Sequence, residues 1–178
     1  MSAANRSQRG EFERIVKLDR LPREPLKLAA EEAERAALAS RFGIEAVHSL
    51  EAELGFAPEG RIVVATGRLT AKIEQLCAVS GEPFRNRIDE PLALRFVPAS
   101  EQPEFEPEEE IELDTAEPDE IYYEGQSFDL GEAIAQSLGL AIDPYAEGPE
   151  AAATREKAGL LDVAPSGPFA ALAALKRD

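Results

Sequence analysis

Two stretches near the middle of the chain alternate apolar and polar residues with a period of two, which is the pattern of a β-strand with one buried face. The first covers residues 61–73 and the second covers residues 85–97. The connection between them, residues 77–84, contains Gly81 and Pro83, which are residue types typical of tight turns. Two consecutive strands joined this closely run antiparallel. The sequence therefore predicts an antiparallel strand pair at the centre of the fold.

Further strands and two main helices are expected around this pair. They are strands over residues 11–18, 47–56 and 120–123, a helix over Ala29–Phe42 that ends at Gly43, and a helix from the capping residue Asp129 to Gly139. Pro91 lacks a backbone N–H, so it places the second long strand at a sheet edge or at a bulge. The predicted fold class is α+β, with an antiparallel β-meander, curled or flat, two main helices and a short C-terminal helix.

The predicted organisation is an α+β domain over residues 1–142, a linker over 143–167 and a C-terminal helix over 168–177. The linker prediction follows from a composition rich in Pro, Gly, Ala and charged residues with weak periodicity. The terminal segment has apolar residues at helical spacing, but about ten residues are too few for a stable isolated helix in water. We therefore expect this helix to dock on its own domain or on a partner.

Negative charge is concentrated in one short stretch of the sequence. The chain has 178 residues, 19 of them basic and 35 acidic, and a net charge of -16. Residues 101–124 contain twelve acidic residues and no basic one, and the rest of the chain has 23 acidic and 19 basic residues. This distribution excludes a uniformly basic nucleic-acid binder and predicts a flexible acidic insert at about residues 99–118. The alternative is an acidic arm that contacts a basic partner or competes with nucleic acid.

Few side chains are suited to catalysis or metal binding. His48 is the single histidine and lies in an alternating strand pattern, which favours a structural role. Cys77 is the single cysteine, so an internal disulfide and a Cys-rich zinc site are excluded, and we expect it to be a small buried residue. The sequence has no Gly-rich phosphate cradle and no catalytic motif. We expect a protein that is not an enzyme and that needs no cofactor or metal.

The sequence also lacks the signals of a membrane or secreted protein. Residues 1–10 are polar and have no apolar segment of the kind found in secretory signals. No apolar run approaches the roughly 20 residues that a membrane-spanning helix needs. We therefore expect a cytoplasmic protein without a membrane partner.

Basic residues recur at the polar positions of the two long predicted strands. They are Arg68 and Lys72 in the first strand and Arg85, Arg87 and Arg95 in the second. On neighbouring strands these side chains share one face, where they form a basic patch able to neutralise a few phosphates of an RNA. The alternative is an ordinary solvated face in which Glu74, Asp89 and Glu90 balance the charge.

Three segments, taken in order, resemble motifs of one family. Residues 77–84 look like the Cys-x-x-Cys-x-x-Pro-Phe turn of the YceD family, also called the domain of unknown function 177 family. Residues 128–131 lead into a helix as the family's Ile-Asp-Leu segment does, and residues 168–176 resemble its C-terminal Asn-Pro-Phe signature. The matching positions are Cys77, Gly81, Pro83, Phe84, Asp129, Leu130, Pro168, Phe169, Leu172, Leu175 and Lys176.

The chain departs from the family pattern at several positions. Ser80 occupies the place of the second cysteine, Gly167 replaces the asparagine, and the predicted linker lacks the His and Cys residues that other members carry. A metal or redox role of those residues therefore does not carry over. The resemblance implies a bacterial factor needed for accumulation of large-subunit (23S) ribosomal RNA, without established catalytic residues.

Two functions remain open at this point. The first is a non-enzymatic ribosome-biogenesis factor that supports synthesis, processing or stability of large-subunit ribosomal RNA through the basic patch. The second is an acidic adaptor or chaperone for a basic ribosomal protein of the large subunit, without direct RNA contact. A metal-dependent ribonuclease is disfavoured, because most of the clustered carboxylates fall in the predicted acidic insert rather than on rigid elements.

Overall fold

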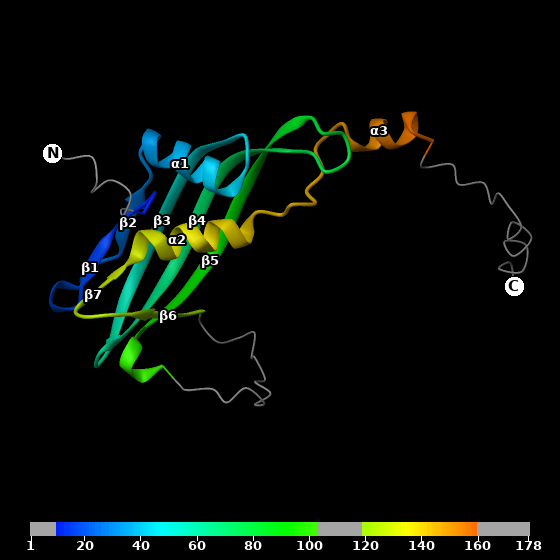
Figure 1. Ribbon diagram of the computed structural model, residues 1–178. Coiled ribbons are helices and arrows are strands. Elements are labelled where there is room, and N and C mark those ends of the chain that lie inside the picture. Colours follow the sequence, from blue (N-terminus) through cyan, green and yellow to red (C-terminus); the bar gives the residue numbers. More distant parts are fainter. Residues whose placement is uncertain (1–9, 103–118, 160–178) are drawn as a thin grey trace, which may run out of the picture.

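The computed structural model describes residues 10–102 and 119–159 of the chain and confirms the α+β class (Figure 1). The strands are β1 (Ile15–Lys17), β2 (Leu26–Ala29), β3 (Ala46–Glu59), β4 (Ile62–Leu76), β5 (Pro83–Pro98), β6 (Asp119–Tyr123) and β7 (Ser127–Asp129). The helices are α1 (Glu32–Phe42), α2 (Leu130–Ala141) and α3 (Ala151–Lys157), with short 3-10 helices η1 (Leu18–Arg20) and η2 (Ala99–Glu101).

The central sheet has five strands in the order β2-β3-β4-β5-β6, and β1 pairs with β7 in a separate two-stranded sheet. Strands β2 to β5 follow one another antiparallel, which confirms the prediction for β3, β4 and β5. The prediction of a wholly antiparallel sheet is wrong at β6, which runs parallel to β5. A parallel neighbour cannot be reached by a tight turn, and residues 99–118 provide the long connection that this arrangement requires.

The long strands extend beyond the predicted bounds because their pairing continues close to the hairpin turns. The turn between β3 and β4 is tight, since Ala57 and Pro58 still pair with β4. Gly60 sits in the turn with a φ of 68°, a left-handed conformation that favours glycine. Among the residues that the structure describes, β6 pairs only with Leu94–Pro98 of β5, so no described strand lies beside Pro91 on that edge. The edge position predicted for Pro91 is therefore confirmed.

The N-terminal region differs from the prediction of one strand over residues 11–18. Only β1 is a strand there, and it pairs with β7 rather than with the central sheet. The sequence pattern does not indicate β2, because this strand has four residues and follows Pro22 and Pro25, a residue type that interrupts regular secondary structure.

α1 and α2 lie on the same face of the central sheet (Figure 1). α1 packs mainly on β3, and α2 packs on β4 and β5. The core lies between the helices and the sheet, and its fully buried side chains include Leu38, Leu50, Leu69, Ile73, Leu94, Phe96, Ile134 and Leu138. The opposite face of the sheet carries no helix of the described residues.

Both main helices have specific residues at their ends. A capping box between Glu31 and Glu34 starts α1 three residues later than predicted, and Gly43 ends it with a φ of 64°, as expected. The Asp129 side chain caps α2, as predicted. Gly139 does not end α2, which continues to Ala141. Instead, Gly139 faces the ring of Phe42, because a Cβ there would lie 2.9 Å from the ring Cε1 atom.

The linker expected over residues 143–167 is, in its described part, attached to the β4–β5 hairpin and contains α3 (Figure 1). The backbone N–H of Ala78 donates to the carbonyl of Ala146 at 3.1 Å, and Gln75 Nε2 donates to the carbonyl of Asp143 at 2.9 Å. The acidic residues 103–118 and the terminal helix expected over 168–177 lie outside the described residues.

Candidate nucleic-acid interface

The sheet face opposite α1 and α2, called the outer face below, carries the basic side chains singled out in the sequence. The outward-facing positions of β4 and β5 include Arg68, Lys72, Arg85, Arg87 and Arg95. In the antiparallel register, Lys72 is directly opposite Arg87, and Glu74 is directly opposite Arg85. The five side chains therefore lie on one face of the sheet, and their contact with RNA stays a prediction.

Carboxylates are interleaved with these basic groups. Asp89 pairs with Arg68 and, at 3.2 Å, with Arg87. The hydrogen bond from Arg68 is the main cause that lowers the pKa of Asp89 below its usual value. Glu120 of β6 pairs with Arg95 at 2.6 Å. The outer face is therefore mixed in charge rather than uniformly basic.

Glu74 connects β3, β4 and β5 on this face. Its Oε2 atom lies 2.9 Å from His48 Nε2 and 3.6 Å from Arg85 Nε. The hydrogen bond with His48, together with the charge of Arg85, lowers the pKa of Glu74. The sequence did not place His48 on the outer face, because an irregularity in pairing between Val47 and Ser49 interrupts the alternation at this point.

The five basic side chains differ in accessibility and in their partners. Arg85, Arg87 and Arg68 have exposed fractions of 79%, 69% and 59%, whereas Arg95 is only 34% exposed beside Glu120. Lys72 is exposed and forms no ion pair with any residue that the structure describes. The accessible positive groups are therefore Arg68, Lys72, Arg85 and Arg87, and Arg95 contributes less.

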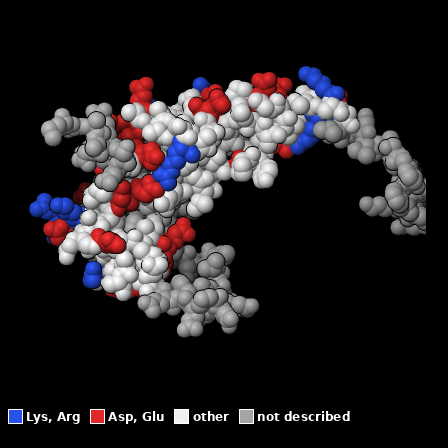
Figure 2. Space-filling model, in the orientation of Figure 1, with Lys and Arg blue, Asp and Glu red and all other residues white. Residues whose placement is uncertain are grey.

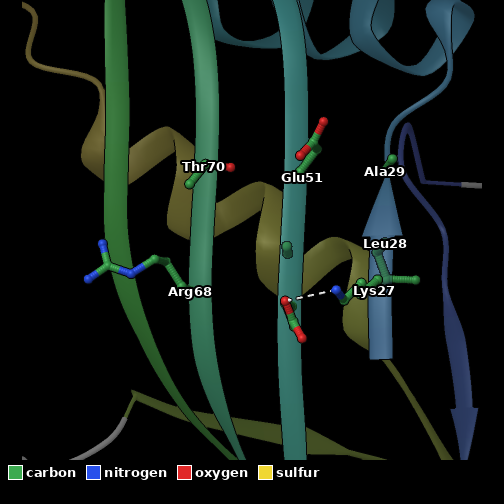
Figure 3. A pocket seen from close by; sticks show the side chains of 8 residues that line it. Lys27, Leu28, Ala29, Glu51, Arg68 and Thr70 are labelled. Carbon is green, nitrogen blue, oxygen red and sulfur yellow. Dashed lines mark ion pairs between the residues drawn. The ribbon is translucent and has the colours of Figure 1, made fainter. Parts of the chain in front are cut away.

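Two shallow hollows lie on the outer face. The first, of about 350 Å³, lies over β2, β3 and β4 and is bordered by an ion pair between Lys27 and Glu53 at 3.5 Å (Figure 3). Arg68 extends away from this hollow toward β5, where Asp89 holds it (Figure 3). The second, of about 320 Å³, is lined by Ser49, Glu51, Thr70, Ala71, Lys72 and Arg87.

Phe, Tyr and Trp do not occupy the outward-facing positions of β3, β4 or β5, whose sequences are described throughout. Phe84 and Phe96 lie at the alternate positions of β5, and Phe96 is fully buried against Phe128. Bases of a nucleic acid would therefore have no aromatic ring of these strands to stack on. Recognition through these three strands would rest on the phosphate backbone. On β6, the Tyr122 hydroxyl donates to Glu120 Oε2 at 2.8 Å, and Glu120 pairs with Arg95.

The helix-bearing face has a different charge pattern. Figure 2 shows acidic side chains gathered over the region of α1 on this face. Arg41 pairs with two carboxylates: its Nη1 lies 3.1 Å from Glu11 Oε2, and its Nη2 lies 2.8 Å from Glu132 Oε1. These ion pairs join the N-terminal segment, α1 and α2. The helix-bearing face is therefore less suited to a polyanion than the outer face is.

Comparison with protein-family models matched residues 65–176 to the model described as YceD, large ribosomal RNA subunit accumulation protein. The match covers well over half of the 178-residue chain. The chain belongs to the YceD family. No curated protein and no solved structure gave a match. The matched range includes the five basic residues and all three motifs that resemble the family.

The second YceD-like motif has a structural role in this chain. The side chain of Asp129 accepts hydrogen bonds from the backbone N–H groups of Arg14, Gly131 and Glu132. Leu130 is fully buried and donates its backbone N–H to the carbonyl of Arg14 at 2.9 Å. This motif closes the N-terminal segment onto the start of α2.

The first YceD-like motif forms the turn between β4 and β5. Cys77 is buried, and its sulfur accepts the backbone N–H groups of Val79 and Ser80, each at 3.4 Å. Gly81 has a φ of 72°, and β5 begins at Pro83. Phe84 packs against Gly148, where an added Cβ would lie 2.9 Å from the ring. The described residues of this motif therefore shape the hairpin and its contact with the segment before α3.

The third YceD-like motif, with Pro168, Phe169, Leu172, Leu175 and Lys176, lies outside the described residues. In the part of the chain that is described, no helix is long and apolar enough to cross a membrane. Over the same residues, no group of three His, Cys, Asp or Glu side chains is arranged to hold a metal ion.

Proposed function

We propose that this chain is a non-enzymatic factor that supports the synthesis, processing or stability of large-subunit (23S) ribosomal RNA in the bacterial cytoplasm. We further propose that it contacts the RNA through the outer face of β4 and β5. The observation that carries this proposal is the convergence of Arg68, Lys72, Arg85 and Arg87 on one open face. Membership of the YceD family supports the role in RNA accumulation.

The electrostatics favour a modest, salt-sensitive interaction. Two carboxylates, those of Asp89 and Glu74, already pair with three of the arginines. A phosphate must compete with these carboxylates, so the outer face has room for only a few phosphate contacts. The salt dependence of affinity grows with the number of phosphates that are neutralised, so a few contacts give weak binding that falls moderately as salt rises. The factor would then associate with RNA transiently rather than coat it.

The absence of catalysis is part of the proposal and rests on the two side chains best suited to nucleophilic or acid–base work. His48 Nε2 is engaged by Glu74 Oε2 at 2.9 Å. Cys77 is buried in the hairpin turn. His48 and Cys77 are not paired with each other, so they do not form the base and nucleophile arrangement that activates a thiol.

The test is RNA retention by a charge-reversed protein. Arg85→Glu together with Arg87→Glu should reduce crosslinking to large-subunit ribosomal RNA in growing cells by roughly tenfold or more, because charged contacts to phosphate are lost. The matched control is Arg20→Glu with Arg23→Glu, which makes the same change in net charge at exposed positions outside the strands of the central sheet. Equal retention by both double variants would contradict contact through the outer face.

The second candidate function is supported by the twelve acidic residues within 101–124. In this function the chain is an adaptor or chaperone for a basic ribosomal protein of the large subunit and does not touch RNA. Replacing residues 103–118 by a Gly/Ser segment of equal length leaves β6 intact and should abolish co-purification with that protein. Co-purification that survives the replacement would exclude this candidate.

A further inference from the structure

The pairing of β4 with β5 places two positive side chains directly across from each other. Lys72 and Arg87 are register partners, and both face outward. Like charges directly opposite on neighbouring strands destabilise a sheet. Asp89 offsets the charge of Arg87 at 3.2 Å, but Lys72 forms no ion pair with the described residues. The arrangement therefore has an electrostatic cost that a bound anion would remove.

The hollow of about 320 Å³ lies at this pair and offers hydroxyl groups beside the charges. Ser49 of β3 is the register partner of Lys72 on the side away from Arg87, so Ser49, Lys72 and Arg87 form one row across three strands. Thr70 is the next outward-facing residue of β4 and also lines the hollow. Lysine, arginine and hydroxyl side chains are the groups that commonly bind phosphate oxygens in proteins.

We propose that this hollow binds a single phosphate group of the RNA backbone, with Lys72 and Arg87 as its charged ligands and Ser49 and Thr70 as hydroxyl ligands. This site rests on the function proposed above and names the part of the outer face that holds RNA. Side chains directly opposite across two strands start about 5 Å apart at their Cβ atoms. The ends of both side chains can therefore meet on one phosphate rather than on two.

Two carboxylates near the hollow limit what it binds. Glu51 lines the hollow and is the register partner of Thr70, so it repels an anion that moves beyond the Lys72 row. Asp89 lies opposite Thr70 on the other side and holds the Arg87 guanidinium through its Oδ2 atom. Asp89 also pairs with Arg68, so the groups in and beside the hollow are three cations (Arg68, Lys72 and Arg87) and two carboxylates. Their net positive charge of one matches one phosphodiester group.

The chemistry of the hollow predicts that it reads charge and not sequence. The ligands are two cations and two hydroxyls, and the outward-facing positions of β3, β4 and β5 have no Phe, Tyr or Trp to stack a base. Contacts to phosphate position an RNA without distinguishing its bases. Single-stranded RNAs of one base type and of mixed sequence should therefore bind with similar affinity.

The experiment measures binding of the full chain to a fluorescent uridine oligonucleotide by anisotropy at several salt concentrations. Lys72→Gln and Arg87→Gln should each weaken binding about tenfold, the effect of one charged hydrogen bond. Because both side chains hold the same phosphate, the double variant should lose much less than the product of the two single losses. The control is Lys27→Gln, an outer-face lysine that pairs with Glu53 at 3.5 Å and whose loss should change affinity less than about twofold.

The outcomes separate this site from the proposed function. If the unsubstituted chain does not bind the oligonucleotide, both the function and the site are overturned. If it binds, but the Lys72→Gln and Arg87→Gln proteins have the same affinity as the Lys27→Gln protein, the site is overturned. RNA contact elsewhere on the molecule would then stand. If the double variant lost as much affinity as the product of the two single losses, the proposal that Lys72 and Arg87 hold one shared phosphate would be overturned.

Thermal unfolding provides a second readout that does not depend on RNA. Lys72→Gln removes one member of the opposed like-charge pair, so its melting temperature should equal or exceed that of the unsubstituted chain. A clearly lower melting temperature would show that Lys72 stabilises the sheet and would overturn the electrostatic premise. Weaker RNA binding without loss of stability is the result that a binding residue gives and a structural residue does not.

Discussion

At the scale of single residues, the carboxylate of Asp129 connects the N-terminal segment to α2. Its Oδ1 atom accepts the N–H groups of Arg14 at 2.8 Å, Gly131 at 2.9 Å and Glu132 at 3.2 Å. Asp129→Ala removes a helix cap and leaves the N–H of Arg14 without its partner. We expect the free energy of unfolding to fall by about 2 kcal/mol, measured by urea denaturation.

The control for this prediction is Asp19→Ala, which removes an exposed carboxylate in η1. Its effect should stay within about 0.5 kcal/mol, as is usual for surface positions. If the two alanine variants were equally stable, Asp129 would have no capping role.

The Cys77 thiol provides a second prediction at this scale. Its pKa is lowered to about 7, mainly by the hydrogen bond with the Ser80 hydroxyl. The folded thiol thus ionises at lower pH than the unfolded thiol, so this contribution to stability is present above the unfolded pKa and is lost as pH falls through about 7. Ser80→Ala should raise the pKa of the thiol. It should therefore make the free energy of unfolding less dependent on pH in the range around pH 7.

Thiolate absorbance in the ultraviolet measures this pKa directly, since Cys77 is the single cysteine of the chain. Ser100→Ala, at an exposed position in η2, is the matched control and should leave the titration unchanged. A titration of the Ser80→Ala protein that overlays the control would show that backbone N–H groups alone set the pKa.

At the scale of elements, the close pairing of β3 with β4 depends on Gly67. A Cβ atom there would lie 1.9 Å from the carbonyl oxygen of Glu53 and 2.8 Å from the Cα atom of Leu54. Both are backbone atoms of the paired strand, so they cannot withdraw without breaking the pairing. Gly67→Ala should lower the free energy of unfolding by about 3 kcal/mol or more in chemical denaturation, because it forces overlap inside a paired sheet.

Gly55 of β3 offers a control in the same hairpin. A Cβ there meets only the carbonyl oxygen of Thr66, at 4.0 Å, which is an ordinary contact. Gly55→Ala should therefore change stability by less than about 1 kcal/mol. A Gly67→Ala protein as stable as the Gly55→Ala protein would mean that β3 and β4 can move apart at Gly67 without loss of stability.

The elements that the sequence predicted are those whose pattern is set by one buried face. β3, β4 and β5 bury one face under the helices and leave the other open, which is the condition under which period-two alternation is visible. β2 and α3 have four and seven residues, too few to show a period. The contacts that hold α3, such as the one from Ala78 to Ala146, join residues that lie far apart in the sequence.

The candidate site was predictable in part for the same reason. The alternation of inward- and outward-facing positions along the strands was enough to place all five basic residues on the outer face. The sequence also indicated Glu74 and Asp89 as balancing carboxylates, and both do pair with these arginines. Which arginine each carboxylate pairs with depends on the register between strands, and this register is not visible in a single strand. The parallel approach of β6, which brings Glu120 to Arg95, could not be predicted because the connection before β6 has no turn signal that fixes its direction.

At the scale of the whole molecule, the net charge of -16 opposes the approach of RNA to the outer face. Residues 103–118 hold eight of the acidic residues, so a Gly/Ser segment of equal length in their place would leave a net charge of -8. We expect this replacement to strengthen RNA binding about three- to tenfold at 50 mM salt, because long-range repulsion falls. The gain should vanish at about 0.5 M salt, where screening leaves only short-range contacts.

A protein that keeps residues 103–118 in scrambled order separates charge from sequence in this prediction. It retains all eight carboxylates and should bind RNA as the natural order does, because repulsion over several ångströms depends on charge and not on order. If the Gly/Ser protein bound RNA no better than the scrambled one at 50 mM salt, these carboxylates would not oppose RNA at the outer face. The carboxylates of the helix-bearing face would then be the remaining source of the repulsion that RNA meets. Charge-neutral variants of Glu31 and Glu32 would be the next proteins to compare.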